Sequence, residues 1–347
     1  MPQSTKIALS SGSPLMGSPV VFQVLAENLS GQSNMAFHRA ILEVKVGVVG
    51  ESTMEVYKLS IPVKSESSSN YLLFDISEAL QAKDDDYEYT PHTGAGTITY
   101  PVYKVQLKAW DEYMKDGQLR TTTAYTLGTN YYFLQGAFTD MERMASTVLR
   151  GVNTLTRKPL TGEVIPDDGL YIYPTPNYAY TDSNFFEGNQ PNAPTSIAVS
   201  IPNLSGTIGG RSIYKDANAE NCYAFQFVNG YGVVESAFAY CLPDKEIPKK
   251  VSEYDVTGPT VFNQIDRHVT RKTASRHRLK MSSGPVTMEW QEWWQEEFLN
   301  TMHAWMLYKG AWVPVSIVPD DTTKGIDLAD DDLPSVEFTV KMDFDGV

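Results

Sequence analysis

The stretch CYAFQFVNGYGVVESAFAYCLP, residues 222–243, consists of two apolar runs separated by Asn229-Gly230-Tyr231-Gly232. Asparagine and glycine tolerate the backbone conformations of tight turns, and the flanking Val, Phe and Tyr residues favour strands. The pattern therefore predicts a β-hairpin. Strand-like runs on either side of it, SIAVSIPNL before and PTVFNQIDRHVTRKTASRHRLKMSSGPVTM after, predict that residues 197–347 form a mainly β domain.

Five of the six tryptophans lie further along, in EWQEWWQEEFLNTMHAWMLYKGAWVPVSI, residues 289–317. We expect a tryptophan-rich helix over 288–308, with Thr287 as its cap and Lys309-Gly310 at its end. The side chains that recur at helical spacing on one face are Trp290, Trp293, Trp294, Phe298, Thr301, Met302 and Trp305. An inward stripe of this kind indicates packing, although an exposed ligand site and a subunit interface are alternatives.

Residues 1–137 read as a β-sandwich. In FHRAILEVKVGVV, Ala40, Leu42, Val44 and Val46 alternate with polar residues, which is typical of a strand with one buried face. FDISEAL breaks this period and predicts a short helix capped by Asp75. Two later strands are separated by Asp116-Gly117, which is a hairpin signal.

Between these domains, residues 138–196 should form a helical connector and an irregular arm rich in Tyr, Pro and Asn. The arm, residues 165–195, lacks any strand or helix period, so we expect it to lie on the surface or on a neighbouring subunit. The predicted fold class is mainly β with a minor α+β character: two β-sandwich-like domains with short helices and a long irregular arm.

Composition narrows the class of protein. The chain has 347 residues and a formal net charge of −14, which argues against nucleic acid as a partner. Cys222 and Cys241 are its only cysteines, so neither a disulfide framework nor a structural zinc site is predicted, although a single bridge between them stays open. No apolar run is long enough for a membrane helix and no signal peptide is evident, so we expect no membrane partner.

Catalytic motifs such as G-x-S-x-G, H-E-x-x-H and the phosphate loop do not occur in the sequence. A glycoside hydrolase would use paired carboxylates, for which Asp84 to Asp86 or Glu289 with Glu292 are the candidates. Acidic runs in loops and on exposed helix faces are usually solvated, however. We therefore predict that the protein is not an enzyme and has no catalytic residue, cofactor or metal site.

Charge is segregated in one region of the C-terminal domain. The stretch 266–280 is strongly basic, whereas 319–334 contains six aspartates. Opposite charges on different surfaces would set the register of a head-to-tail homo-oligomer, while two solvated loops that never meet are the alternative. The predicted interface residues are Arg267, Arg271, Lys272, Arg276, Asp320, Asp321, Asp330, Asp331 and Asp332.

Several segments together resemble the tail structural proteins of phages and prophages of Bacteroidetes, including the crAss-like group. In chain order they are GSPVVFQV at 17–24, FDISEAL at 74–80, FVNGYGVVES at 227–236, and the tryptophan helix running into WVPVSIV at 312–318. The resemblance implies a virion protein of the tail, collar or baseplate, assembled in the host cytoplasm. It would form a homo-oligomeric ring and contact other tail proteins.

The alternative function is a carbohydrate-binding tail adhesin or lectin-like module. Its candidate site is the aromatic stretch YIYPTPNYAY, residues 171–180.

Overall fold

The computed structural model describes most of the chain. The described residues are 6–12, 14–31, 33–64, 70–85, 87–139, 142, 151–152, 155–175, 180–181, 188–204, 206–216, 221–246, 249–256, 267–275, 277–319 and 334–342. The fold is mainly β, as predicted, with several antiparallel sheets, a closed barrel and few short helices.

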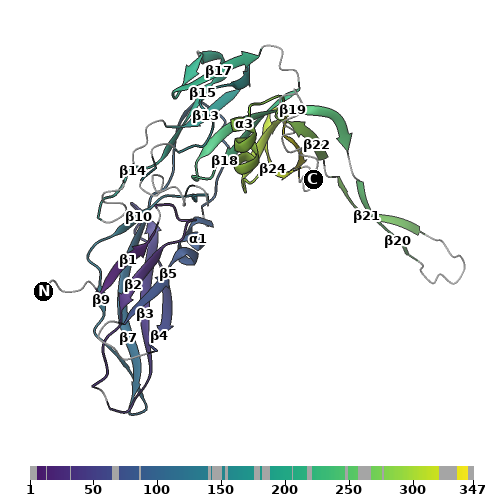
Figure 1. Cartoon of the computed structure of the whole chain (residues 1–347). Coiled ribbons are helices and arrows are strands. Elements are labelled where there is room, and N and C mark those ends of the chain that lie inside the picture. Colours follow the sequence, from purple (N-terminus) through teal and green to yellow (C-terminus); the bar gives the residue numbers. More distant parts are fainter. Residues whose placement is uncertain are drawn as a thin grey trace, which may run out of the picture.

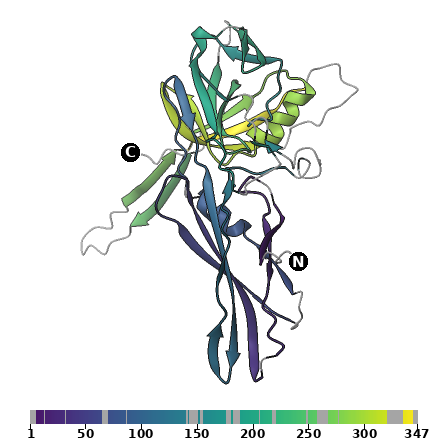
Figure 2. The same cartoon turned by 90° about the vertical axis from the view of Figure 1, so that its left-hand side faces the viewer.

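The N-terminal unit is a β-sandwich, seen as the long lower part of Figures 1 and 2. One sheet has the order β1 (Ile7–Ser11), β2 (Val21–Leu25) and β5 (Tyr71–Asp75). The other has the order β10 (Tyr131–Phe133), β7 (Tyr103–Lys115), β3 (Met35–Val48) and β4 (Glu55–Pro62), with β8 (Gln118–Thr121) and β9 (Tyr125–Thr126) also on β7. Asp116 and Gly117 both have positive φ in the β7–β8 turn, which confirms the predicted hairpin.

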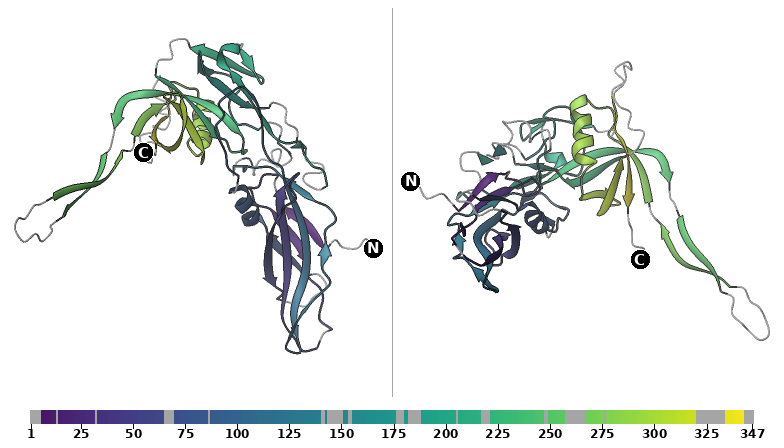
Figure 3. Two further views of the ribbon diagram at one scale, coloured as in Figure 1. Left: turned by 180° about the vertical axis from the view of Figure 1, so that it is seen from behind. Right: turned by 60° about the horizontal axis from the view of Figure 1, so that its bottom comes forward.

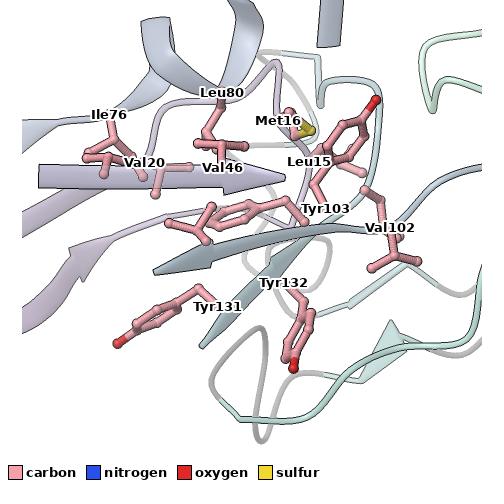
Figure 4. Packing of buried hydrophobic residues seen from close by; sticks show 14 of the residues in the cluster. Leu15, Met16, Val20, Val46, Ile76, Leu80, Val102, Tyr103, Tyr131 and Tyr132 are labelled. Carbon is pink, nitrogen blue, oxygen red and sulfur yellow. The ribbon is translucent and has the colours of Figure 1, made fainter. Parts of the chain in front are cut away.

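The core of the sandwich fills the space between these two sheets. The alternating residues Ala40, Leu42, Val44 and Val46 of β3 are all completely buried, as their spacing predicts. Helix α1 (Ser77–Asp85) covers one end of this core, where Figure 4 shows its Leu80 near Val46 of β3. Asp75 accepts a hydrogen bond from the backbone N–H of Ser77 at 2.9 Å, close to its predicted capping role.

A small middle unit follows the sandwich. One sheet has the order β13 (Leu170–Pro174), β15 (Thr195–Ser200) and β6 (Gly96–Thr99), and the other has β12 (Glu163–Pro166), β17 (Arg211–Asp216) and β16 (Thr207–Ile208). A 3-10 turn, η2 (Ile201–Asn203), follows β15, and the short pair β11 (Gly151–Val152) and β14 (Tyr180–Thr181) stands apart from both sheets. The two sheets enclose a core that includes Ile165, Tyr171 and Ile213.

This middle unit changes the predicted organisation. Part of the stretch expected to be irregular forms strands. Tyr171 and Ile172 pair with residues of β15, and Ile165 pairs with Lys215 of β17. The predicted boundary at residue 196 therefore cuts through the β13–β15 pair. The helical connector expected after residue 138 lies outside the described residues, apart from a few positions such as Glu142.

The C-terminal unit is a closed six-stranded barrel, where a second sandwich-like domain was expected. Its strands, in order around the barrel, are β18 (Cys222–Val228), β19 (Val234–Glu246), β22 (His277–Ser282), β25 (Glu337–Met342), β24 (Ala311–Pro319) and β23 (Ala304–Tyr308). The β18–β19 connection is the predicted turn: the Gly232 N–H donates to the Asn229 carbonyl at 2.9 Å, and Gly232 has a φ of 73°.

The tryptophan helix is shorter than predicted. It comprises α3 (Met288–Trp293) and a π-helical turn, η3 (Trp294–Phe298), and the prediction of helix up to residue 308 is wrong. The Asn300 side chain donates to the carbonyls of Gln295 and Glu296 at 3.0 and 3.1 Å, so it satisfies the helix end. Residues 304–308 instead form β23, which gains strand partners on both sides.

Lys309 and Gly310 consequently have a different role from the predicted helix end. Both have positive φ, and they join the paired residues Tyr308 and Ala311 in a two-residue hairpin turn. Met302, expected on the buried face of the helix, is 92% exposed in the connection before β23.

One arginine ties the sandwich to the barrel. Arg157 donates to the Glu142 carboxylate at 2.5 and 2.7 Å and to the Ala137 carbonyl at 3.0 Å, and it pairs with Glu297 of η3. Its guanidinium also lies 4.4 Å from the ring centre of Tyr231 in the β18–β19 turn. Since Ala137 follows the last sandwich strand, this cluster fixes how the two units meet.

Candidate assembly interface

A two-stranded arm leaves the barrel between β19 and β22. Within the barrel these strands pair from Tyr240 with Ser282 to Glu246 with Arg278, and their register shifts between Cys241 and Lys245. Beyond this pair the chain continues into β20 (Lys249–Val256) and β21 (Arg267–Ser275). From here on we call these two strands the arm; they are distinct from the irregular arm expected at residues 165–195. Figures 1 and 3 show the arm standing away from the barrel and from the sandwich.

The strands of the arm pair only with each other within the part of the chain that the structure describes. The register runs from Lys249 opposite Ser275 to Val256 opposite Arg267, and it shifts between Ser252 and Glu253. An isolated two-stranded hairpin is marginally stable in water, because neither of its faces rests on a core. Among the described residues, the arm is a hairpin of this kind.

The predicted basic interface residues fall partly on this arm. Arg267, Arg271 and Lys272 are brought together on β21, and Arg271 is the extra residue at the register shift, because Lys272 pairs with Ser252 and Thr270 pairs with Glu253. Such bulges bend a strand and increase its twist. The other predicted interface residues, Arg276, Asp320, Asp321, Asp330, Asp331 and Asp332, lie outside the described residues. The contact predicted between the two charged stretches stays a prediction.

A cavity of about 410 Å³ lies between the middle unit and helix α3. Its walls come from β12, β17 and β19, from the turn at Gly284 to Val286, and from Trp290, Trp293 and Trp294. In Figures 1 and 3, α3 lies on the side of the barrel that faces away from the arm.

Buried charges line and support this cavity. Lys158 pairs with Glu163 and donates to the Ser236 carbonyl at 2.7 Å, and its ammonium lies 5.2 Å from the Trp293 ring centre. Nearby, burial raises the pKa of Glu235, and the opposing influence of Lys158 and Arg211 does not cancel this rise. Sequence reasoning missed this cluster. Its only signal was a few charged residues among apolar strand positions.

Apolar side chains remain exposed on β12, β17 and α3 and just before β12, and of these Val164 lines the cavity. Val164 of β12 and Tyr214 of β17 are register partners and are 46% and 61% exposed. Leu160, whose carbonyl accepts the Ser212 N–H at 2.9 Å, and Met288 of α3 are exposed as well. Large apolar residues that are exposed next to each other, as Val164 and Tyr214 are, are a feature of interaction surfaces.

The tryptophans themselves are packing elements, as predicted. Trp290, Trp293 and Trp294 are 5%, 3% and 4% exposed, and the Trp290 indole N–H donates to the Thr161 carbonyl at 2.6 Å. Trp294 stacks on Phe338 of β25, with ring centres 5.8 Å apart. Trp305 is also buried, but it lies on β23 and not on the helix.

The other candidate sites gain little from the structure. Tyr171, which opens the aromatic stretch considered for carbohydrate binding, is completely buried, and its hydroxyl donates to Glu163 at 2.5 Å. Glu289 and Glu292 lie exposed on α3, and the side chains of Asp84 to Asp86 are outside the described set. Cys222 and Cys241 are not joined by a disulfide bond.

The described residues contain no cluster of His, Cys, Asp and Glu side chains that could bind a metal ion. Within the same residues, no helix has the length and hydropathy needed to cross a membrane.

No family model, no curated protein and no solved structure matches the chain.

Proposed function

We propose that the protein is a phage virion structural protein of the tail, collar or baseplate, which assembles into a homo-oligomeric ring and contacts other tail proteins. The observation that carries this proposal is the arm. It projects from the barrel and, among the described residues, has no strand partner outside itself.

The energetics of the arm favour an assembled state. Ordering each backbone residue costs roughly 1–2 kcal/mol, and a lone hairpin buries too little apolar surface to offset that cost. A neighbouring subunit would supply the missing contacts. Because every subunit carries the same arm, a head-to-tail contact repeats and closes into a ring when the rotation between neighbours permits.

The assignment to a phage tail rests on the resemblance of the quoted segments to tail structural proteins of Bacteroidetes phages. Two further features are compatible with it. The chain is built from rigid β units, and the Arg157 cluster clamps the sandwich to the barrel, so that contacts on one unit can be transmitted to the other. These features suit a component whose role is to hold a fixed geometry.

The proposal is tested by the mass and shape of the isolated protein. Multi-angle light scattering should give a multiple of the chain mass of 38.7 kDa, and negative-stain images should show rings. A carbohydrate-binding adhesin without an assembly role would instead stay monomeric and bind members of a glycan array. That result would overturn the proposal.

A further inference from the structure

We propose that the arm of one subunit docks on the neighbouring copy along strand β12 and over the cavity beside it, a surface that we call the β12 edge. This inference rests on the proposed ring and names the two surfaces that meet in it. It differs from the pairing of the 266–280 and 319–334 stretches predicted from charge alone, because the acidic partner is another surface.

The β12 edge offers a site for strand addition. β12 pairs with β17 on one side, and no strand of the described chain pairs with its other side. An unpaired strand edge presents N–H and C=O groups to any extended segment, and an added strand would lie about 4.8 Å away. The arm is an extended segment that lacks a third strand. Each surface therefore supplies what the other needs.

The surroundings of β12 are apolar where a docked segment would cover them. Val164 and Tyr214 are exposed partners on neighbouring strands, and Leu160, just before β12, is exposed as well. The cavity of about 410 Å³ adjoins β12 through Glu163 and Val164 and could accept side chains of the docked strand. Burial of this surface would contribute about 25 cal/mol for each Å² of apolar area removed from water.

Charge favours the arm as the occupant. The sequence of the arm strands contains Lys249, Lys250, Arg267, Arg271 and Lys272, against only Glu253 and Asp255. At the β12 edge the charges are reversed. Asp167 and Asp168 are exposed directly after β12, and Asp216 lies opposite Pro166 in the β12–β17 register.

The basic residues close to this edge offset the acids only in part. Lys158 is buried and paired with Glu163. Lys215 is exposed, and its ammonium donates to the Pro202 carbonyl at 3.4 Å. On balance an acidic edge therefore faces a basic arm.

The placement of the two surfaces suits a ring. α3, which forms one wall of the cavity, lies on the side of the barrel away from the arm in the views of Figures 1 and 3. Two different surfaces on opposite sides of one subunit make a head-to-tail contact, as ring closure requires.

Cross-linking tests the contact directly. Unlabelled and isotope-labelled protein are mixed, allowed to assemble, and treated with a carbodiimide, which joins lysine amines to carboxylates without a spacer. Mass spectrometry should then identify mixed-isotope pairs between Lys249, Lys250 or Lys272 and Asp167, Asp168 or Asp216. Mixed pairs that join the arm only to other surfaces would overturn the docking proposal and leave the ring intact.

A charge swap provides the second test. The arm variant Lys250→Glu, Arg271→Glu, Lys272→Glu and the edge variant Asp167→Lys, Asp216→Lys should each weaken association by about tenfold or more, because reversal turns attraction into repulsion at every contact. Combining both sets in one chain should restore much of the association. The control, Glu51→Lys with Glu88→Lys, reverses two exposed acids in the N-terminal half and should assemble normally.

The outcomes separate the two proposals. Circular dichroism and melting curves establish that each variant folds. If wild type assembles, the edge variant assembles equally well and the combined variant does not regain the association lost by the arm variant, docking at the β12 edge is contradicted. The proposed ring is not contradicted by that result. A wild-type chain that stays monomeric at all concentrations contradicts the ring, and this docking with it.

Discussion

At the scale of single residues, Trp294 should be a principal stabilising side chain of the barrel. It packs against Phe298 and Phe338 with ring centres 4.7 and 5.8 Å apart. Trp294→Ala should lower the free energy of unfolding by about 3–5 kcal/mol, as other large-to-small core changes do. Urea unfolding followed by circular dichroism measures this loss.

Met302 supplies a matched control for Trp294, because it is a large apolar residue of the same segment but is almost fully exposed. Met302→Ala should change stability by less than about 0.5 kcal/mol. Equal effects of the two substitutions would show that the indole is not a core element.

Arg157 should matter more for the junction than an exposed arginine would. Arg157→Met removes the partner of Glu297, whose side chain is almost completely buried, and leaves that carboxylate with only the Gly230 N–H at 2.8 Å among its described contacts. Breaking a buried pair in this way costs about 3–5 kcal/mol. Calorimetry should show the lower transition temperature, and Arg157→Lys should recover only part of the loss because lysine cannot bridge two carboxylates in the same fork geometry.

The same cluster predicts a pH dependence. Burial by itself would raise the pKa of Glu142, but hydrogen bonds from Arg157 and Tyr231 outweigh it and hold that pKa below its usual value of 4.5. Stabilisation from a lowered pKa is fully present above the unfolded value and is lost as the pH falls through the folded value. The stability difference between wild type and Arg157→Met should therefore shrink below about pH 4.5. A difference that stays constant from pH 7 to pH 3 would contradict this origin.

At the scale of elements, the Lys309-Gly310 turn allows a stabilising change. Lys309 has a φ of 51°, which is costly for a lysine, whereas asparagine adopts this conformation readily and is preferred in such two-residue hairpins. Lys309→Asn should stabilise the barrel by about 0.5–1 kcal/mol. A lower melting temperature for the variant would indicate that the contact of the Lys309 ammonium with the Tyr308 ring, at 5.3 Å, matters more than the backbone.

Sequence reasoning identified the type of most elements and misplaced some of their ends. The alternation in β3 and the turns at Asp116 and Gly232 were predictable, because local backbone chemistry decides them. The end of the tryptophan helix was not predictable from local sequence. Lys309-Gly310 suits both a helix terminus and a hairpin turn, and Trp305 continues the helical spacing by coincidence. The helix ends where the Asn300 side chain binds the Gln295 carbonyl, and residues 304–308 form a strand because β18 pairs with them. These contacts exist only in the folded chain.

The middle unit shows the same limit over longer distances. The strand β6 at 96–99 pairs with β15 at 195–200, and β12 pairs in parallel with β17. Neither partner is close in sequence, so no local pattern reveals the pairing. Lys158, Glu163 and Glu235 are likewise brought together only by the fold, because they come from different segments of the chain.

At the scale of the whole molecule, the sequence showed where basic residues concentrate but not which structural element they belong to. The stretch 266–280 proved to hold the second strand of an arm, β21, which stands away from the barrel. The acidic stretch chosen as its partner lies largely outside the described residues, whereas the β12 edge required knowledge of which strands lack a neighbour. Such edges are properties of topology, and composition does not reveal them.

The central claim is that the arm holds neighbouring subunits together and does not hold the barrel together. The chain permits a clean excision, because Glu246 and Arg278 are directly paired where β19 and β22 leave the barrel. Replacing residues 247–277 by Asn-Gly would close these strands with a short hairpin turn. The barrel core, from Phe225 to Met342, contains no residue of the excised segment. The excision removes one barrel residue, His277, the first of β22.

The most direct measurement is sedimentation velocity of wild type and of this arm-excised variant over a wide concentration range. We predict that wild type sediments as an oligomer and that the excised variant sediments as a folded monomer with an unchanged near-ultraviolet circular dichroism signal from its tryptophans. An excised variant that assembles as tightly as wild type, or a wild type that never leaves the monomer, would contradict the claim.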